Sequence, residues 1–368
     1  MFPTRYSDIL HLLDQIDPVA YGKTRNYADG SVTRLSPYIS RGVISTRQVL
    51  ESVVRRGYKI PQIESFVKEL CWRDYFQRIG QTCTDELVSD NGRSQANVDH
   101  YLLPAALQMA ETGIDAIDDG IRSLYDTGYM HNHMRMYVAA LATNIGHAHW
   151  QMPAKWMYFH LLDADFASNH ASWQWVCGVR SHKKYIANQE NINKYFYSTQ
   201  RGSFLDFPYE TLEDLPVPKV LTETTRFEDK TELPETGNPN IDPSRPIMVY
   251  TIYQLDPAWA AELPANRILL LEPGHFAQFP VCARTLAFAL ELAKSIPGIQ
   301  VFTGAFNTLK ELSGGTEIQF REHPLTRHFS GTESPRKWIV PEVDGYFPSF
   351  SAYWKKISPL IYRRYAAK

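Results

Sequence analysis

The hydrophobic pattern changes abruptly near residue 210, and this change constrains the fold more than any other feature of the sequence. Before it, apolar residues recur every three to four positions, as in 47–57 and 64–79, which indicates amphipathic helices. Residues 211–246 lose this pattern and contain six prolines among Thr, Glu and Asp, the composition of a linker. After the linker, short apolar segments alternate with helical stretches, which is typical of a parallel α/β layer. The sequence therefore predicts a mainly α fold, in which a helical domain is followed by a small α/β domain.

The predicted domain boundaries follow from these changes of pattern. The domains are a helical domain at 1–210, the linker at 211–246, an α/β domain at 247–330 and a C-terminal tail at 331–368. Further helices are expected at 132–145, 154–162, 281–296 and 307–312, and buried strands at 247–253, 267–273, 299–304 and 317–324.

Charge and composition exclude several classes of protein. The 38 Lys and Arg residues nearly balance the 40 Asp and Glu residues, which excludes a uniformly basic protein of the histone type but allows a local basic groove. The sequence has no apolar run of about 18 residues, and its N-terminus has neither the basic start nor the apolar core of a signal peptide. Its four cysteines lie far apart. We therefore expect a cytoplasmic protein with no membrane partner.

Histidine pairs are the only pattern that suggests a metal site, and their spacing argues against one. His131 and His133 are two residues apart, as are His147 and His149. On a helix, side chains two positions apart point in directions that differ by about 200°, so neither pair chelates well. No Cys-x-x-Cys pair is present. We expect no metal.

Aromatic residues make up 13% of the chain, and five of its eight tryptophans fall between Trp72 and Trp175. The same part of the chain contains four ordered motifs, at 31–38, 69–75, 127–136 and 162–169, the last followed by Trp-Gln-Trp at 173–175. In order and spacing, these motifs resemble the flavin-binding domain of the DNA photolyase and cryptochrome family. The resemblance covers about 20–200 and implies a helical domain that binds FAD.

Thr33, Arg34 and Ser36 offer two hydroxyls and a guanidinium at the head of a predicted helix, which suits a pyrophosphate. The alternative is an ordinary helix cap with a surface arginine. The resemblance implies that Arg135 and Asp163 form an ion pair beside the isoalloxazine, with Asp165 near its uracil-like edge or ribitol. It places Asn169 near flavin N5, whereas a helix-terminal asparagine is the alternative. The full set of implied FAD-binding residues is Tyr21, Thr33, Arg34, Leu35, Ser36, Phe66, Arg73, Asn132, Arg135, Asp163, Asp165 and Asn169.

Glu69, Trp72 and Arg73 lie on neighbouring faces of one predicted helix, where Glu69 and Arg73 have the spacing of a plain surface pair. The resemblance implies instead a pocket for a flipped-out pyrimidine dimer. Trp72 and Trp175 would stack on the dimer and Glu69 would hydrogen-bond its base edge. Met136 would add an apolar wall, and Arg25 would hold a DNA phosphate.

The reaction that the resemblance implies is light-driven electron transfer from reduced FAD to a cyclobutane pyrimidine dimer in UV-damaged DNA. Asn132 and Met136 stand where six-four photolyases carry histidines, which favours the cyclobutane dimer over the six-four photoproduct. A cryptochrome-type receptor and a flavin-free nucleic-acid-binding module remain alternatives. The flavin-type motifs begin near residue 20, without the family's N-terminal antenna domain, and we expect no antenna chromophore.

Photolyases usually relay electrons to the flavin along three tryptophans. Here the inner two match Trp173 and Trp150, while the outermost position aligns with Asn97. Because an asparagine side chain cannot be oxidised in that role, we expect the relay to end at Trp150 or to divert to an aromatic residue such as Tyr101. The alternative is that both tryptophans are simply packed core residues.

Overall fold

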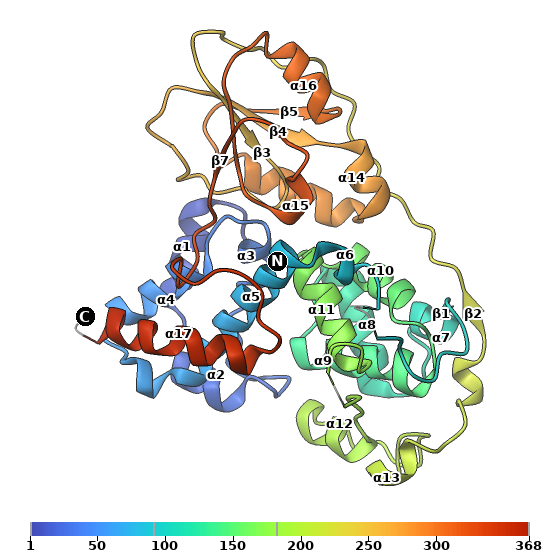
Figure 1. Cartoon of the computed structure of the whole chain (residues 1–368). Helices are drawn as coiled ribbons and strands as arrows, with labels where there is room; N and C mark the ends of the chain where they lie inside the picture. The colour runs from blue at the N-terminus through green and yellow to red at the C-terminus, as the bar shows by residue number, and fades with distance from the viewer. Residues whose placement is uncertain (1, 91–92, 182, 367–368) are drawn as a thin grey trace. The chain divides into compact units, whose positions relative to one another are not determined.

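The computed structural model of the chain describes residues 2–90, 93–181 and 183–366. It divides into two compact units (Figure 1). The first unit contains Met1–Gly22, Thr33–Thr82 and Lys230–Lys368, and the second contains Lys23–Val32 and Cys83–Asp229. These units are not the consecutive blocks drawn from the sequence, because the first unit joins segments from the start and the end of the chain.

The helical part of the first unit is built around the two long helices expected from the hydrophobic pattern. Ser45 and Gln48 form a capping box that starts α4 (Thr46–Arg55), and the predicted apolar face of α4 is buried. α4 packs against α5 (Glu64–Thr82) and α1 (Tyr6–Asp14). The remaining helical segments are α2 (Pro18–Thr24, which ends in the second unit), α3 (Ser36–Ser40), a 3-10 turn (Ile60–Gln62) and α17 (Phe350–Tyr365).

The C-terminal segment of the chain packs onto α5, where it holds a buried carboxylate. Asp74 accepts hydrogen bonds from Thr46 Oγ1 at 2.6 Å and from the Ile339 backbone N–H at 3.0 Å. Burial raises the pKa of Asp74, and these hydrogen bonds partly offset that cost. The Arg78 guanidinium lies 3.7 Å from the ring centroid of Trp338. The expected tail is therefore an ordered part of the first unit over its described residues.

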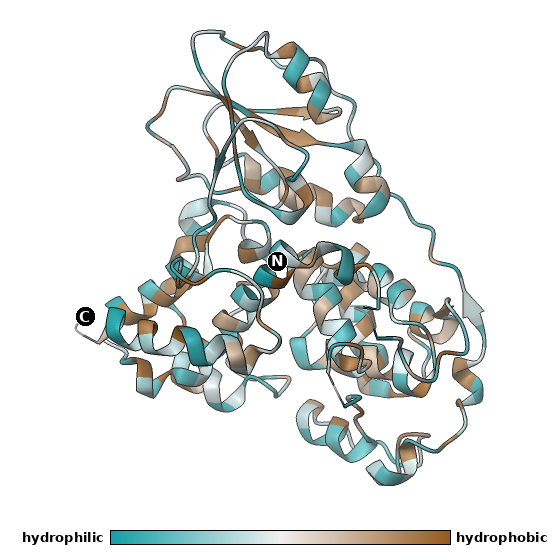
Figure 2. Cartoon of the chain, in the orientation of Figure 1, coloured by the Kyte–Doolittle hydropathy of each residue, from teal (hydrophilic) through white to brown (hydrophobic). Residues whose placement is uncertain are grey.

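Five parallel strands form the sheet of the first unit in the order β5-β4-β3-β6-β7. In the register, Val249 lies opposite Ile268 and Phe320. Both faces of the central strands are buried, and Figure 2 shows these strands in hydrophobic colours. The parallel α/β layer expected from the sequence is confirmed. Its elements are β3 (Ile247–Tyr250), β4 (Asn266–Leu271), α14 (Pro273–Gln278), α15 (Ala283–Ala293), β5 (Ile299–Thr303), α16 (Phe306–Leu312), β6 (Ile318–Arg321), a 3-10 turn (Pro324–Thr326) and β7 (Thr332–Ser334).

The carboxyl end of β3 contacts the helical part of the first unit through residues 41 and 42. Arg41 is fully buried and donates from Nη1 to the Ile252 carbonyl oxygen at 3.3 Å, while its own carbonyl accepts from the Leu255 N–H at 2.9 Å. Gly42 has a φ of +66°, and a Cβ there would lie 2.3 Å from the Tyr253 carbonyl oxygen. Backbone contacts that leave no room for a side chain therefore join the sheet to the N-terminal helices.

The second unit is a bundle whose central helices α8 to α11 carry its buried residues. The helix expected at 132–145 is present as α9 (Asn132–Ala140), continued by a π-helical turn (Leu141–Ile145). The helix expected at 154–162 is α10 (Gln151–His160). The other elements are α6 (Thr84–Leu87), β1 (Leu103–Pro104), α7 (Ala105–Met109), α8 (Asp115–Thr127), α11 (Phe166–Val176), α12 (Gln189–Phe196), α13 (Tyr209–Leu212), a 3-10 turn (Lys219–Leu221) and β2 (Thr224–Thr225), which pairs antiparallel with β1.

Candidate functional site

The candidate site residues expected from the sequence fall into both units, and each half is described by itself. The first-unit half consists of Tyr21, Thr33, Arg34, Leu35, Ser36, Phe66, Glu69, Trp72 and Arg73. The second-unit half consists of Arg25, Asn132, Arg135, Met136, Trp150, Asp163, Asp165, Asn169, Trp173 and Trp175.

In the first-unit half, residues 33–36 form a turn that leads into α3. The Thr33 hydroxyl accepts a hydrogen bond from the Leu35 N–H at 3.4 Å. Arg34 is exposed and has a φ of +52°, a backbone conformation that few residues other than glycine adopt. Leu35 is buried and anchors the turn, and Ser36 begins the five-residue α3. The turn thus presents a guanidinium and hydroxyls on a fixed backbone, which suits a phosphate.

Four of the expected site residues, Phe66, Glu69, Trp72 and Arg73, lie on α5. Phe66 is buried, and its ring is in edge contact with Tyr21 at a centroid distance of 5.1 Å. Glu69, Trp72 and Arg73 are half-buried further along the helix. Tyr21 therefore contacts the N-terminal part of α5, and Glu69, Trp72 and Arg73 remain partly accessible.

A contact with Trp72 that sequence reasoning missed comes from α17. The ring of Phe350 stacks on the Trp72 indole with a centroid distance of 4.0 Å and an interplanar angle of 11°. Trp72 also contacts the rings of Tyr75 and Phe76 on its own helix. One face of the indole expected to stack on a base is thus occupied by the chain itself.

In the second-unit half, the structure contains the ion pair expected between Arg135 and Asp163. Arg135 Nη2 lies 2.9 Å from Asp163 Oδ2, with 21% and 4% of the two side chains exposed. Arg135 Nε also donates to the Met130 carbonyl oxygen at 2.9 Å. Two hydrogen bonds therefore fix the guanidinium, and its charge compensates a buried carboxylate.

Asp165 begins α11 as its N-cap. Its Oδ1 accepts from the Ser168 N–H at 2.8 Å, which satisfies one of the helix's initial N–H groups. Asn169, the residue after Ser168, donates from Nδ2 to the Ala154 carbonyl oxygen at 3.1 Å. Asp165 is buried, so the head of α11 has a fixed arrangement of polar groups.

The remaining expected residues of the second unit differ in accessibility. Asn132 is exposed at the first position of α9, and Arg25 and Met136 are half-buried. Trp175 is 36% exposed and tilts against the Tyr185 ring at a centroid distance of 6.1 Å. Trp175 is thus the more accessible of the two tryptophans assigned to a substrate.

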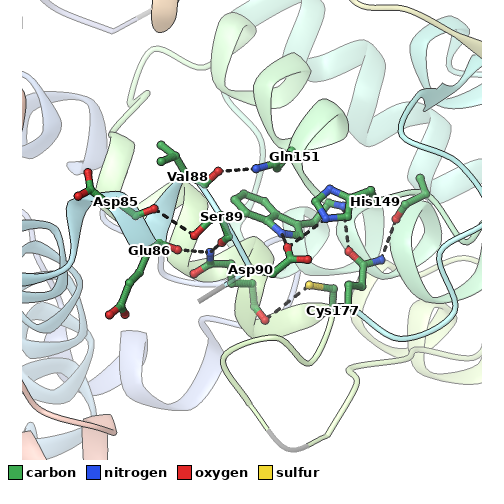
Figure 3. A network of polar contacts seen from close by, with 12 residues as sticks. Asp85, Glu86, Val88, Ser89, Asp90, His149, Gln151 and Cys177 are labelled. Atoms are coloured by element: carbon green, nitrogen blue, oxygen red, sulfur yellow. Dashed lines mark hydrogen bonds and ion pairs between the residues drawn. The ribbon is translucent and has the colours of Figure 1, made fainter. Parts of the chain in front are cut away.

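The two tryptophans assigned to electron transfer are both buried. Trp173 lies in α11, and Trp150 directly precedes α10. The Trp150 Nε1–H donates to Asp90 Oδ1 at 2.9 Å, and His149 Nε2 lies 3.0 Å from the same oxygen (Figure 3). Sequence reasoning missed Asp90 because nothing in the pattern links it to residues 60 positions later.

A half-buried histidine, also missed from the sequence, lies beside these groups. His170 packs edge-on against Trp150 at a centroid distance of 5.6 Å, and its Nδ1 lies 3.0 Å from the Phe166 carbonyl oxygen. Burial lowers the pKa of His170 to about 4, so the imidazole is neutral at physiological pH.

The four histidines of the suspected metal pairs have other partners. His131 Nδ1 accepts from the His133 N–H, and His133 Nε2 lies 3.2 Å from the Tyr185 hydroxyl. His147 and His149 each contact an aspartate. Across residues 2–90, 93–181 and 183–366, no group of three or more His, Cys, Asp or Glu residues could hold a metal ion. Within the same ranges, no helix is both long and apolar enough to cross a membrane.

Parts of this chain are similar in sequence to known photolyases and cryptochromes. Residues 66–227 match the family described as the FAD-binding domain of DNA photolyase. A deoxyribodipyrimidine photo-lyase from Alkalihalophilus pseudofirmus is 31% identical over 151 residues, which are 40% of this chain and 31% of that protein. A cryptochrome DASH from Gloeobacter violaceus is 31% identical over 171 residues, 44% of this chain and 34% of that protein.

Among solved structures, a Synechocystis cryptochrome is 22% identical to this chain. The match covers 60% of this chain and 48% of that chain, with a TM-score of 0.47. The chain spans about a third of the length of the curated relatives listed above and of similar photo-lyases from Streptomyces griseus and Vibrio cholerae.

Proposed function

Because the chain carries the FAD-binding domain of the DNA photolyase family over residues 66–227, we propose that it repairs cyclobutane pyrimidine dimers in UV-damaged DNA by light-driven electron transfer. The observation that carries this proposal is the 2.9 Å ion pair between the half-buried Arg135 and the buried Asp163, which lies within the matched region. Removing two opposite charges from water costs free energy, and packing alone does not require charged side chains at these positions. Binding of a polar cofactor would account for them.

Each unit, taken by itself, has polar groups that suit a part of FAD. At the head of α11, the buried Ser168 hydroxyl makes no hydrogen bond to any of the described residues, which leaves a donor for a ligand. Arg135 lies in the same unit with its guanidinium fixed. In the first unit, Arg34 and the hydroxyls of Thr33 and Ser36 suit an anionic pyrophosphate.

Each of these residues has a proposed task. Thr33, Arg34 and Ser36 hold the phosphates, Arg135 and Asp163 orient the ring system, and Asn169 contributes a neutral amide near its reactive nitrogen. FAD, when bound, supplies the absorption of blue light and the electron that the reaction requires.

The remaining tasks concern the substrate. Trp72 and Trp175 stack on the flipped-out dimer, which is worth about 1–3 kcal/mol for each base. Glu69 hydrogen-bonds the base edge and stabilises negative charge that develops there. Because Phe350 covers one face of Trp72, the dimer uses the other face or the edge of this indole.

The test is repair of a dimer-containing oligonucleotide by the reduced, FAD-loaded protein under blue light, with a dark control. Glu69→Gln and Trp175→Ala should lower repair or binding of damaged DNA and leave the flavin spectrum unchanged. Glu51→Gln is the matched control, since Glu51 pairs with Arg47 on the surface of α4. Unchanged repair and binding in both site variants would contradict the proposed pocket.

A second candidate function is a cryptochrome-type blue-light receptor, and the stacking of Phe350 on Trp72 favours it. A helix held on a functional surface by an aromatic contact is the kind of two-state element that a light signal needs. This function predicts FAD-loaded protein without repair, in which illumination increases protease cleavage around α17. Repair with unchanged cleavage would exclude it.

A further inference from the structure

The buried indole of Trp150 has a carboxylate as its hydrogen-bond partner. Trp150 is fully buried, and its Nε1–H donates to Asp90 Oδ1 at 2.9 Å. His149 Nε2 lies 3.0 Å from the same oxygen, and Figure 3 shows this contact between His149 and Asp90. The Asp90 side chain is 29% exposed, so it connects the buried indole to the solvent.

Tyr101 lies on the outer side of this group. Its ring stacks on His149 with a centroid distance of 4.7 Å and an interplanar angle of 25°, and 67% of Tyr101 is exposed. The backbone sets this position, because the His149 N–H donates to the His100 carbonyl at 2.8 Å and the Asp99 N–H to the His147 carbonyl at 2.9 Å. His149 and Trp150 are 6.0 Å apart between ring centroids. Three rings therefore lead from the core to the surface.

We propose that Asp90 accepts the indole proton when Trp150 is oxidised, and that Tyr101 is the surface residue that returns the electron. This inference rests on the flavin electron transfer of the proposed function. It assigns Asp90 a chemical role that no part of the sequence pattern indicated.

The steps balance as follows. One electron leaves the Trp150 indole for an oxidant of the flavin class, and the Nε1–H bond breaks as its proton moves to Asp90 Oδ1. The products are a neutral indolyl radical and a carboxylic acid. Tyr101 then gives one electron to Trp150, which recovers its proton from Asp90, while the Tyr101 hydroxyl loses its proton to water. The net change is oxidation of Tyr101 to a tyrosyl radical, with Asp90 restored.

An oxidised indole carries a positive charge in a site closed to water, which is costly unless the charge is compensated or removed. A carboxylate at 2.9 Å does both. The indole hydrogen bond already points to Asp90, so the proton moves along an existing hydrogen bond. His149 Nε2 must donate toward the carboxylate form of Asp90, so this imidazole is not the acceptor.

The first test replaces the carboxylate with an amide. In FAD-loaded Asp90→Asn, the amide oxygen can still accept the indole hydrogen bond but takes up no proton. Transient absorption after a light flash should therefore show the tryptophan radical cation in place of the neutral radical seen in the wild type. Asp90→Glu should restore the neutral radical. Asp99→Asn, which removes a second aspartate paired with a histidine, is the matched control and should behave like the wild type. A neutral radical formed at the wild-type rate in Asp90→Asn would overturn the assignment.

The second test concerns Tyr101. Tyr101→Phe should abolish the tyrosyl signal in electron paramagnetic resonance and lengthen the life of the Trp150 radical. Tyr346→Phe removes another exposed phenol, in the first unit, and should leave both unchanged. An unaltered tyrosyl signal in Tyr101→Phe would exclude Tyr101 as the terminal donor.

These readouts are independent of repair. If the protein binds FAD but repairs no dimer, the flash experiment still decides the role of Asp90. If it binds no FAD, a ruthenium polypyridyl photo-oxidant replaces the flavin, and the signal of Trp150→Phe is subtracted to isolate Trp150. The failure of the proposed function and the failure of this inference are thus distinguishable.

Discussion

The two halves of the candidate site differ in how their residues are held. In the second unit, Arg135 and Asp163 are fixed to each other, and Asp165 is fixed to the helix it caps. In the first unit, Arg34 is exposed on a turn, and Trp72 is covered on one face by Phe350. The hydrogen bonds of Arg135, Asp163 and Asp165 stabilise the fold, and the same residues are available to bind a ligand. For Arg34 and Trp72, the exposed surface of the side chain determines what a ligand can contact. Substitutions in the two halves should therefore fail in different ways.

The largest expected effect comes from breaking the ion pair of the second unit. Asp163→Ala leaves the mostly buried Arg135 without its partner, which should lower the free energy of unfolding by about 3–5 kcal/mol and release FAD. Denaturant titration and the absorption spectrum measure these effects. Asp119→Ala breaks the exposed pair with Arg122 and should cost about 0–1 kcal/mol. Full flavin occupancy in Asp163→Ala would contradict the expectation that the ion pair of the second unit is needed to hold FAD.

The next effect is a pH dependence that both units share. Burial lowers the pKa of His170 in the second unit and of His275 in the first to about 4, against about 6.5 in an unfolded chain. As pH falls from about 6.5 to 4, the unfolded chain binds protons that the folded chain does not, so the free energy of unfolding decreases. The loss is at most about 3 kcal/mol for each histidine.

Substitution separates the contributions of the two units to this pH dependence. His170→Gln should flatten the decrease for the second unit, and His275→Gln should flatten it for the first. Urea titrations at several pH values measure the slopes. If neither variant changes its slope, these two histidines are not the cause.

A smaller effect tests the cover over Trp72. Phe350→Ala removes a stacked ring from a half-buried site and should cost about 1–2 kcal/mol of stability. It should also increase the quenching of tryptophan fluorescence by acrylamide and, if Trp72 meets a base, tighten the binding of damaged DNA. Tyr346→Phe, a change at an exposed aromatic ring of the same unit, is the control. Weaker binding would mean that Phe350 supports the pocket instead of covering it.

The smallest effect concerns the cap of α11. Asp165→Ala removes the acceptor of the Ser168 N–H and should cost about 1 kcal/mol, whereas Asp165→Asn keeps an acceptor and should cost less. Thermal unfolding compares the two. Equal losses would show that the charge of Asp165, and not its hydrogen bond, stabilises the helix.

Local sequence patterns predicted many elements of this molecule, but they did not predict its long-range contacts. The apolar periods predicted α4, α5 and four of the five strands of the sheet, and the family motifs predicted the Arg135–Asp163 pair. The edge strand β7 was missed because its exposed Thr-Glu-Ser sequence has no apolar signal. The helix α17 was missed because it follows a segment without periodicity and contains Pro359.

The candidate site shows the same limit. Phe350 and Asp90 were not predicted, since each meets its tryptophan only after a long excursion of the chain. The match of residues 66–227 to the FAD-binding domain of DNA photolyase agrees with the predicted resemblance and with the expected FAD cofactor. The roles of individual site residues remain predictions.

The packing of the C-terminal segment on α5 also fixes the order in which the chain completes its fold during translation. The hydrogen bond from the Ile339 N–H to Asp74 joins residues that are 265 positions apart. It can form only after every residue of the second unit has left the ribosome. The first unit is thus completed last, and a nascent chain exposes the apolar and aromatic side of α5 in the meantime. Until Ile339 and Phe350 have been synthesised, Asp74 and Trp72 lack the contacts that the C-terminal segment makes with them in the folded chain.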